Sequence, residues 1–234
     1  MCGRYVRKSD KQKIADAFHL AKVPDVVMAP SDYNVAPTTH QPVIRNSKEG
    51  EQELVLMRWG LIPHFTKQLS DVKGISTINA RAETLEKSST WRVPFQRRRC
   101  LIPADGFYEW KKLDEKTKQP YMFGMKDAAP FAFAGLWDAW KEPAGESWLQ
   151  SFSIITTDPN ELTATVHSRM PVILKPSEYD RWLDRSEDER PPVDLLRPYD
   201  AGAMTAWPVD PRVGNVRNNE PGLCNAWVCP PNSA

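Results

Sequence analysis

The residue with the most unusual chemistry is Cys2, which follows the first methionine in the opening stretch MCGRY. Methionine is normally removed when the second residue is small, and the mature chain would then begin with an amine and a thiol on adjacent carbons. An α-amine has an ordinary pKa of about 7.7–8.0, so a useful fraction of it is neutral near pH 7. Arg4 and Arg7 follow closely, and we expect these cations to lower the pKa of the thiol.

Three roles stay open for this cysteine when it is considered alone. A 1,2-aminothiol condenses with an aldehyde to give an imine, and its sulfur then closes a five-membered thiazolidine ring. An N-terminal cysteine is also a nucleophile that can cleave acyl bonds. The third possibility is a small residue that methionine removal tolerates and that has no chemical role.

The stretch INARAE places Asn79 and Arg81 two residues apart. On a strand, both side chains would face the same side. Asparagine offers a donor and an acceptor together, and arginine offers a rigid fork that suits phosphate. The pair could therefore hold a sugar-phosphate, or it could be the surface edge of a strand.

Two further motifs contain candidate acid–base groups. In DGFYEWKK, Glu109 lies between two aromatic residues, which would raise its pKa and favour general acid–base work. An exposed strand face, with Glu109 paired to a lysine, is the alternative, and Trp110 could stack on a nucleobase. In VHSRMP, His167 is either an acid–base group or a structural histidine, and Arg169 could contact a phosphate.

Composition excludes several other classes of protein. The 234 residues carry a net charge of +1, so any nucleic-acid site must be a local basic patch. P-loop, GxGxxG, HExxH and GxSxG motifs are absent, and the four histidines show no metal-ligand spacing, so we expect neither metal nor cofactor. No apolar run approaches a membrane span and the opening residues are polar, so we expect a cytoplasmic protein, most simply a monomer.

The pattern of elements predicts an α+β protein with one domain over residues 1–225 and a tail over 226–234. Many short strands would form a mixed, barrel-like sheet with a few peripheral helices. Ser9 is expected to cap a first helix, and Asp158 to cap another at DPNEL. A helix is also expected near residues 83–93, and RRR at 97–99 is interpreted as a solvated basic face.

Taken together, the motifs resemble the SRAP family, the SOS-response-associated peptidases or abasic-site processing proteins. The resemblance rests on stretches that occur in this order: MCGRY, YNVAP, RWGLIP, INARAET, CLIPADGFYEW, HSRMPVIL and VGNVRN. It extends from residue 2 to about residue 219. It implies a single α+β domain with a barrel-like sheet and a basic groove for single-stranded DNA.

The resemblance also implies a function and roles for residues. Proteins of this family bind single-stranded DNA and form a covalent thiazolidine crosslink with abasic sites, through a Schiff base at the N-terminal cysteine. The implied catalytic residues are Cys2, Asn79, Glu109 and His167. The implied DNA-binding residues are Arg4, Asn34, Trp59, Arg81, Trp110 and Arg169.

Two departures and two rival functions remain. Tyr5 stands where the family often has phenylalanine, and HFTKQLSDVKG after RWGLIP lacks a tryptophan-rich stretch, which leaves the residues that wedge the DNA undefined. An N-terminal-nucleophile cysteine peptidase, limited to self-processing, would use the same Cys2. A non-catalytic single-strand binder would use only the tryptophans and arginines.

Overall fold

The sequence folds around a closed barrel of five strands, β10-β4-β3-β6-β9, in which β9 and β10 pair to complete the ring. The computed structural model describes residues 2–22, 25–72, 77–143, 145–184 and 190–228. The β10–β4 pair is parallel and the other pairs of the ring are antiparallel, so the barrel is mixed, as the sequence predicted. Closure removes the open edges of these strands.

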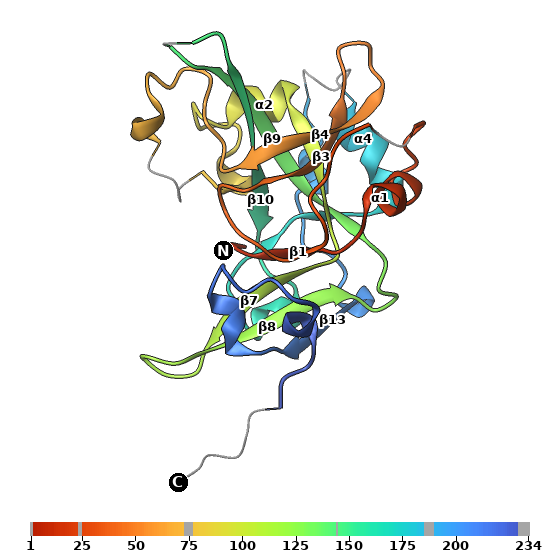
Figure 1. Ribbon diagram of the computed structural model, residues 1–234, viewed down its shortest axis with the longest axis vertical. Helices are drawn as coiled ribbons and strands as arrows, with labels where there is room; N and C mark the ends of the chain where they lie inside the picture. The colour runs from red at the N-terminus through yellow and green to blue at the C-terminus, as the bar shows by residue number, and fades with distance from the viewer. Residues whose placement is uncertain (1, 23–24, 73–76, 144, 185–189, 229–234) are drawn as a thin grey trace.

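A second sheet, β13-β8-β7-β1-β2, lies below the barrel, and β1 runs between the two (Figure 1). The strands are β1 (Tyr5–Arg7), β2 (Asp32–Val35), β3 (His40–Asn46), β4 (Gln52–Trp59), β5 (Asn79–Arg81), β6 (Arg99–Ala104), β7 (Gly106–Lys112), β8 (Lys118–Met125), β9 (Phe131–Lys141), β10 (Trp148–Thr157), β11 (Met170–Pro171), β12 (Ile173–Leu174) and β13 (Met204–Pro208).

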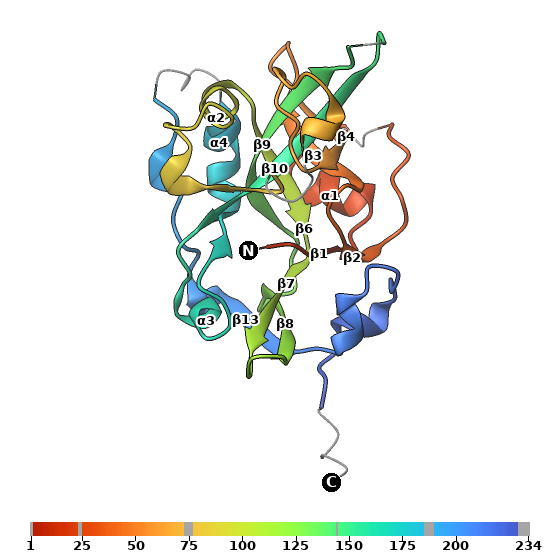
Figure 2. The same cartoon turned by 90° about the vertical axis from the view of Figure 1, so that its left-hand side faces the viewer.

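The helices are short and peripheral, and Figure 2 shows α2 and α4 beside the barrel and α3 near β13. They are α1 (Lys11–Ala17), α2 (Arg92–Arg97), α3 (Glu161–Ala164) and α4 (Tyr179–Leu183). Turns of 3-10 helix occupy Leu69–Asp71, Ala82–Thr84, Pro176–Glu178, Val193–Leu195, Ala201–Ala203, Pro211–Gly214 and Pro221–Cys224.

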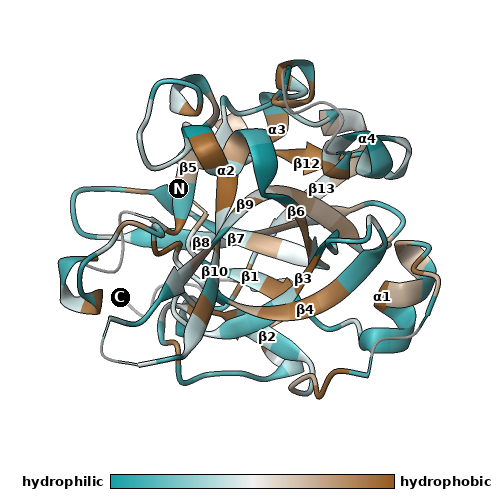
Figure 3. Cartoon of the chain, turned by 90° about the horizontal axis from the view of Figure 1, so that it is seen from above, coloured by the Kyte–Doolittle hydropathy of each residue, from teal (hydrophilic) through white to brown (hydrophobic). Residues whose placement is uncertain are grey.

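Two hydrophobic clusters explain why the strands and helices pack as they do. One fills the barrel and the space towards the second sheet, and it includes Cys2, Tyr5 and Trp59. The other lies where the helices cover the barrel, with Phe95 and Trp182 among its members. In Figure 3, hydrophobic segments follow β3 and β4, while hydrophilic loops surround them.

Several local expectations were wrong. The cap of α1 is Asp10, whose carboxylate accepts from the Lys13 N–H, because Ser9 instead bonds to buried Asp105. The cap of α3 is Asn160 rather than Asp158.

The stretch 83–93 also departs from the expectation. It forms 3-10 and turn structure, and the helix begins only at Arg92. Within RRR, Arg99 is buried and donates to backbone carbonyls, including that of Trp182, so this triplet is not a solvated face.

The division at residue 225 stays a prediction. The described chain still contacts the second sheet at Trp227, whose N–H donates to the Pro208 carbonyl at 2.8 Å.

Candidate active site

Cys2 lies at the entrance to β1, between the barrel and the second sheet. The Tyr108 N–H donates to the Arg4 carbonyl at 3.0 Å, which sets the first residues beside β7. The thiol is fully buried, and burial together with the nearby Glu109 carboxylate raises its pKa above the usual value. The expected lowering by arginines is therefore wrong for this conformation, because Arg7 is itself buried and bound to Gln41 and to carbonyls.

Asn79 contacts Cys2 directly. β5 is added to the barrel along β10, with Asn79 opposite Ile154. This register turns the amide inward, where only 8% of the residue is exposed, and its Nδ2 donates to the Cys2 carbonyl at 2.9 Å. Its Oδ1 is buried and accepts no hydrogen bond from the described residues, so it can serve a bound group. A surface strand edge is excluded for Asn79.

Glu109 is buried as well, with 3% of the residue exposed, which excludes the exposed strand face as its setting. Burial raises the pKa of this carboxyl to about 7. Its Oε2 lies 3.9 Å from Nε2 of His167. A carboxyl that titrates near neutrality both gives and takes protons at physiological pH, as acid–base catalysis requires.

His167 follows α3, and the turn after that helix brings it to the site. Its Nδ1 lies 3.0 Å from the Arg169 N–H and 3.2 Å from the Arg169 carbonyl oxygen, and the first, shorter contact belongs to the tautomer that carries the ring proton on Nε2, towards Glu109. Burial lowers the pKa of the imidazole, so the neutral ring predominates at pH 7.

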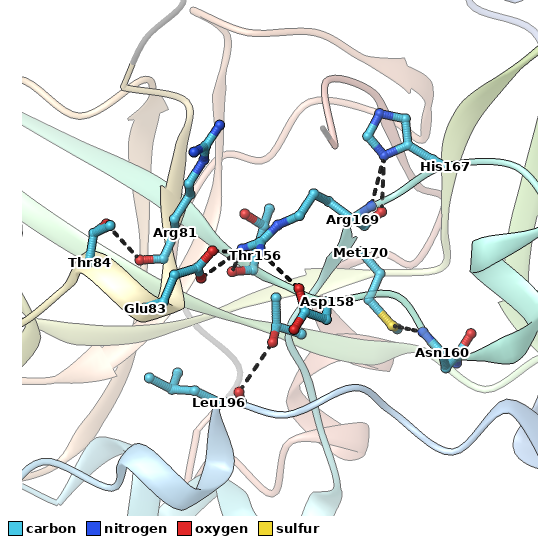
Figure 4. Close-up of polar contacts among 11 residues, drawn as sticks. Arg81, Glu83, Thr84, Thr156, Asp158, Asn160, His167, Arg169, Met170 and Leu196 are labelled. Carbon is cyan, nitrogen blue, oxygen red and sulfur yellow. Dashed lines mark hydrogen bonds and ion pairs between the residues drawn. The ribbon is translucent and has the colours of Figure 1, made fainter.

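Arg169 is bound within the protein. Its guanidinium forms a forked pair with Glu83 at 2.7 and 2.9 Å and also reaches Asp158 at 3.2 Å (Figure 4). The same group donates to the Thr156 carbonyl on β10 at 2.7 Å. A DNA phosphate would therefore compete with Glu83 for this arginine.

The other predicted DNA-binding residues divide into two groups. Arg81 is exposed at the end of β5, and Arg4 and Trp110 are partly exposed. Trp59 is fully buried, and its indole N–H donates to the Ile78 carbonyl at 3.0 Å, so it cannot stack on a base in this conformation. Asn34 is buried too and donates to the carbonyls of Val213, Asn215 and Asn218. Both residues are tied into the fold through these donors, while the buried Oδ1 of Asn34 accepts no hydrogen bond from the described residues.

The structure adds an aromatic residue that the sequence motifs did not single out. Phe65 is 54% exposed in the irregular segment after Trp59, where it lines a hollow together with Thr77, which lies two residues before Asn79. The available signal was an aromatic residue within a polar stretch that lacks periodicity. A larger apolar hollow, lined by Phe18, Leu54 and others, shares no residue with this site.

Within the described ranges, no group of three or more histidine, cysteine, aspartate or glutamate residues could hold a metal ion. Among the helices described, none is long and apolar enough to cross a membrane.

Comparisons with known proteins place this arrangement in a family. Residues 1–216 match the family described as SOS response associated peptidase (SRAP), and the chain belongs to this family. It is 43% identical over 225 residues to the abasic site processing protein YoqW of Bacillus subtilis, covering 95% of this chain and 98% of that protein. It is 41% identical over 228 residues to YoaM of the same organism, also named an abasic site processing protein, covering 97% and 98%.

A crystal structure of a protein from Bacteroides thetaiotaomicron shares the fold. Its TM-score is 0.87 at 29% identity, and the match covers 97% of this chain and 100% of that one. The expected single α+β domain with a barrel core is therefore confirmed.

Proposed function

We propose that this protein binds single-stranded DNA at abasic sites and captures the opened sugar as a thiazolidine on Cys2 after Met1 is removed. The observation that carries the proposal is the Asn79–Cys2 hydrogen bond of 2.9 Å, beside a Glu109–His167 pair separated by 3.9 Å. Three residues that lie far apart in the sequence, Asn79, Glu109 and His167, gather around Cys2, which would become the chain end. The names of the relatives support an abasic-site substrate.

The chemistry balances without a cofactor. Removal of Met1 turns the Cys2 amide nitrogen into an amine, which adds to the C1′ aldehyde. Loss of one water gives the imine. The sulfur then adds to the same carbon, its proton passes to the nitrogen, and the ring closes with no change in oxidation state.

Glu109 is the group suited to move these protons. It can protonate the departing hydroxyl of the carbinolamine and later accept the proton of the thiol. Its pKa of about 7 leaves both forms populated at neutral pH. The buried thiol needs such a base, because its own pKa is raised.

His167 and Asn79 are the other two residues of the proposed catalytic group. The Nε2–H of neutral His167 is a donor that would assist opening of the sugar ring. The free Oδ1 of Asn79 would accept from a hydroxyl of the opened sugar, while its Nδ2 keeps the Cys2 carbonyl fixed. Both residues hold their groups in place before substrate binds, which lowers the entropic cost of the reaction.

DNA contacts would come from exposed and partly exposed groups around this centre. Arg4, Arg81 and Arg169 would take phosphates, and Trp110 and Phe65 would stack on bases. The net charge is only +1, so local cations must supply the attraction, and affinity should fall with salt.

The test is a denaturing gel of purified protein with an oligonucleotide that carries one abasic site. Wild type is expected to give a shifted covalent band, and Cys2→Ala none above background, with a thermal midpoint close to that of wild type. Alanine is also small, so Met1 removal is matched, and intact mass spectrometry checks it in both proteins. An equal band from Cys2→Ala, or no band from wild type lacking Met1, would reject the proposal.

The family description favours one subsidiary activity, a self-limited peptidase that exposes Cys2. A chain with several residues fused before Cys2 tests it by mass spectrometry. Self-processing predicts a product that begins at Cys2 and that Glu109→Gln slows. An unprocessed fusion would leave methionine removal as the route.

A further inference from the structure

The segment that presents Phe65 is irregular, but it is tied to the barrel at alternate residues. The Ile62 N–H donates to the Ser151 hydroxyl at 2.7 Å, and the His64 N–H donates to the Asp138 carboxylate at 3.0 Å. The Trp140 indole N–H donates to the Thr66 carbonyl at 2.7 Å. These anchors come from paired strands, since Asp138 lies opposite Ser151 in the β9–β10 ladder. We call residues 61–66 the Phe65 loop.

Asp138 is the central anchor. The residue is 1% exposed, yet its carboxylate has several partners: the backbone N–H groups of His64 and Ala139, the His64 ring and the Arg98 guanidinium. An ionised carboxylate is stable in such a buried place only when it is paired and hydrogen-bonded. Its Oδ2 lies 3.0 Å from His64 Nδ1, which therefore donates, and this fixes the orientation of the ring.

The fixed His64 ring in turn supports Phe65. The two rings meet edge to face, with centroids 5.3 Å apart and an angle of 83°. The backbone on either side of Phe65 is held at residues 64 and 66, while the ring itself is left largely exposed. A surface aromatic held in this way loses little conformational entropy when a base stacks on it.

The Phe65 loop is also joined to the strand that carries Asn79. The Leu61 N–H donates to the Thr77 carbonyl at 3.2 Å, and the Ile78 carbonyl accepts from the Trp59 indole. The loop is therefore joined to the segment that leads into β5, whose Asn79 contacts Cys2. A base next to the captured sugar would meet an aromatic surface whose position is set from the barrel.

We infer that Asp138 is a positioning residue for DNA binding: through His64 and the anchored loop, its buried carboxylate sets Phe65 as a stacking surface for a nucleobase. The inference rests on the proposed function, because it assumes single-stranded DNA as the ligand. Asp138 is not expected to touch DNA or the reacting atoms. Its effect should therefore appear in affinity and not in the rate of the bound complex.

The test is a double-mutant cycle with Asp138→Asn, Phe65→Ala and the combined variant. Binding is measured by fluorescence anisotropy with an intact single-stranded oligonucleotide, and crosslinking is measured separately at saturating abasic DNA. Phe65→Ala is expected to weaken binding about 5- to 100-fold, the range of one base–aromatic stack. Asp138→Asn should also weaken binding of the oligonucleotide. The combined variant should bind no worse than Phe65→Ala alone. The crosslinking rate at saturation should stay within about 2-fold in all three.

The matched control is Asp210→Asn, which removes another buried carboxylate that pairs with an arginine and caps a turn. It should leave DNA affinity unchanged. Should Asp138→Asn fail to fold, Trp140→Phe removes the anchor at Thr66 and takes its place in the cycle.

The outcomes separate the two proposals. Wild-type affinity in Asp138→Asn, or losses that add in the combined variant, would overturn the positioning role. Absence of a covalent product in wild type would overturn the proposed function, and the binding cycle would still decide the role of Asp138, because it uses intact DNA.

Discussion

Two buried asparagines, Asn79 and Asn34, both occur in distinctive motifs but have different hydrogen-bond partners. Asn79 holds the carbonyl of Cys2 at 2.9 Å and stands beside Glu109 and His167. Asn34 binds the carbonyls of Val213, Asn215 and Asn218, which clasps the segment around VGNVRN to β2. The comparison teaches that partners define the setting of a motif asparagine: Nδ2 of Asn79 holds Cys2, whereas Nδ2 of Asn34 joins a distant loop, and the buried Oδ1 of each accepts no hydrogen bond from the described residues.

The largest expected effect concerns the site around Asn79 and Cys2, and it is an effect on the crosslinking rate. Glu109→Gln should slow crosslinking about 100- to 1,000-fold, within the range of general acid–base catalysis, because glutamine cannot exchange protons. Single-turnover kinetics on abasic single-stranded DNA measures this. A rate within 3-fold of wild type would show that Glu109 is only structural.

The same variant has a pH signature. Burial raises the pKa of Glu109 from about 4.5 to about 7, so the folded protein keeps this proton where the unfolded chain releases it. Wild type should therefore lose unfolding free energy as the pH rises from about 4.5 to about 7, and Glu109→Gln should lack this loss. Urea unfolding of both proteins at pH 5 and pH 8 tests the sign: the variant gains stability relative to wild type at the higher pH.

The next largest effect concerns Asn34 and the free energy of unfolding. Asn34→Ala leaves buried backbone carbonyls without their donor, which should cost about 1–3 kcal/mol. For a domain of this size the thermal midpoint should fall by roughly 2–12 °C. Below that midpoint, crosslinking should stay near the wild-type rate. An unchanged midpoint with slowed crosslinking would instead give Asn34 the role that the resemblance implied.

The smallest expected effect concerns Arg169. Like Asn34, this residue is paired within the protein, and like Asn79, it is proposed to contact the DNA. Glu83→Gln should remove the charged competitor for the Arg169 guanidinium, which keeps its contacts with Asp158 and Thr156, and tighten binding of single-stranded DNA about 2- to 5-fold at low salt, with the gain shrinking as salt rises. Stability should change by less than about 1 kcal/mol, as for an exposed ion pair.

The matched control for Glu83→Gln is Asp194→Asn. It breaks a similar forked pair, with Arg181 at 2.7 and 2.9 Å. An equal gain in affinity from both variants would indicate a general effect of net charge. A gain from Glu83→Gln alone supports competition at Arg169.

The sequence predicted the many short strands well, but it predicted the helix caps poorly. The many short strands and the mixed, barrel-like sheet that the sequence predicted are present, among them the hairpin of β3 and β4. The caps at Ser9 and Asp158 were wrong because several polar residues stand side by side at each helix start, and tertiary contacts select among them.

In the candidate site, too, some expectations from the sequence agree with the structure and others do not. For Glu109 the sequence left open a carboxyl of raised pKa between aromatic residues and an exposed strand face, and the structure buries it. The lowered pKa expected for the Cys2 thiol was wrong, because nearness in sequence says nothing about burial. Arg98 and Arg99 adjoin in one basic triplet, yet one pairs with buried Asp138 and the other binds backbone carbonyls.

By itself, the sequence determined the residue types that can react, the strand periodicity and the family to which the motifs point. It could do so because these depend on side-chain chemistry and local spacing. Only the tertiary structure decided which groups meet and how much water reaches them. Pairing of β5 with β10 and of β7 with β1 brings Asn79 and Glu109 towards Cys2, and packing between distant segments buries Trp59 and Asn34. Burial and partners depend on contacts between distant segments, and no single stretch of sequence contains them.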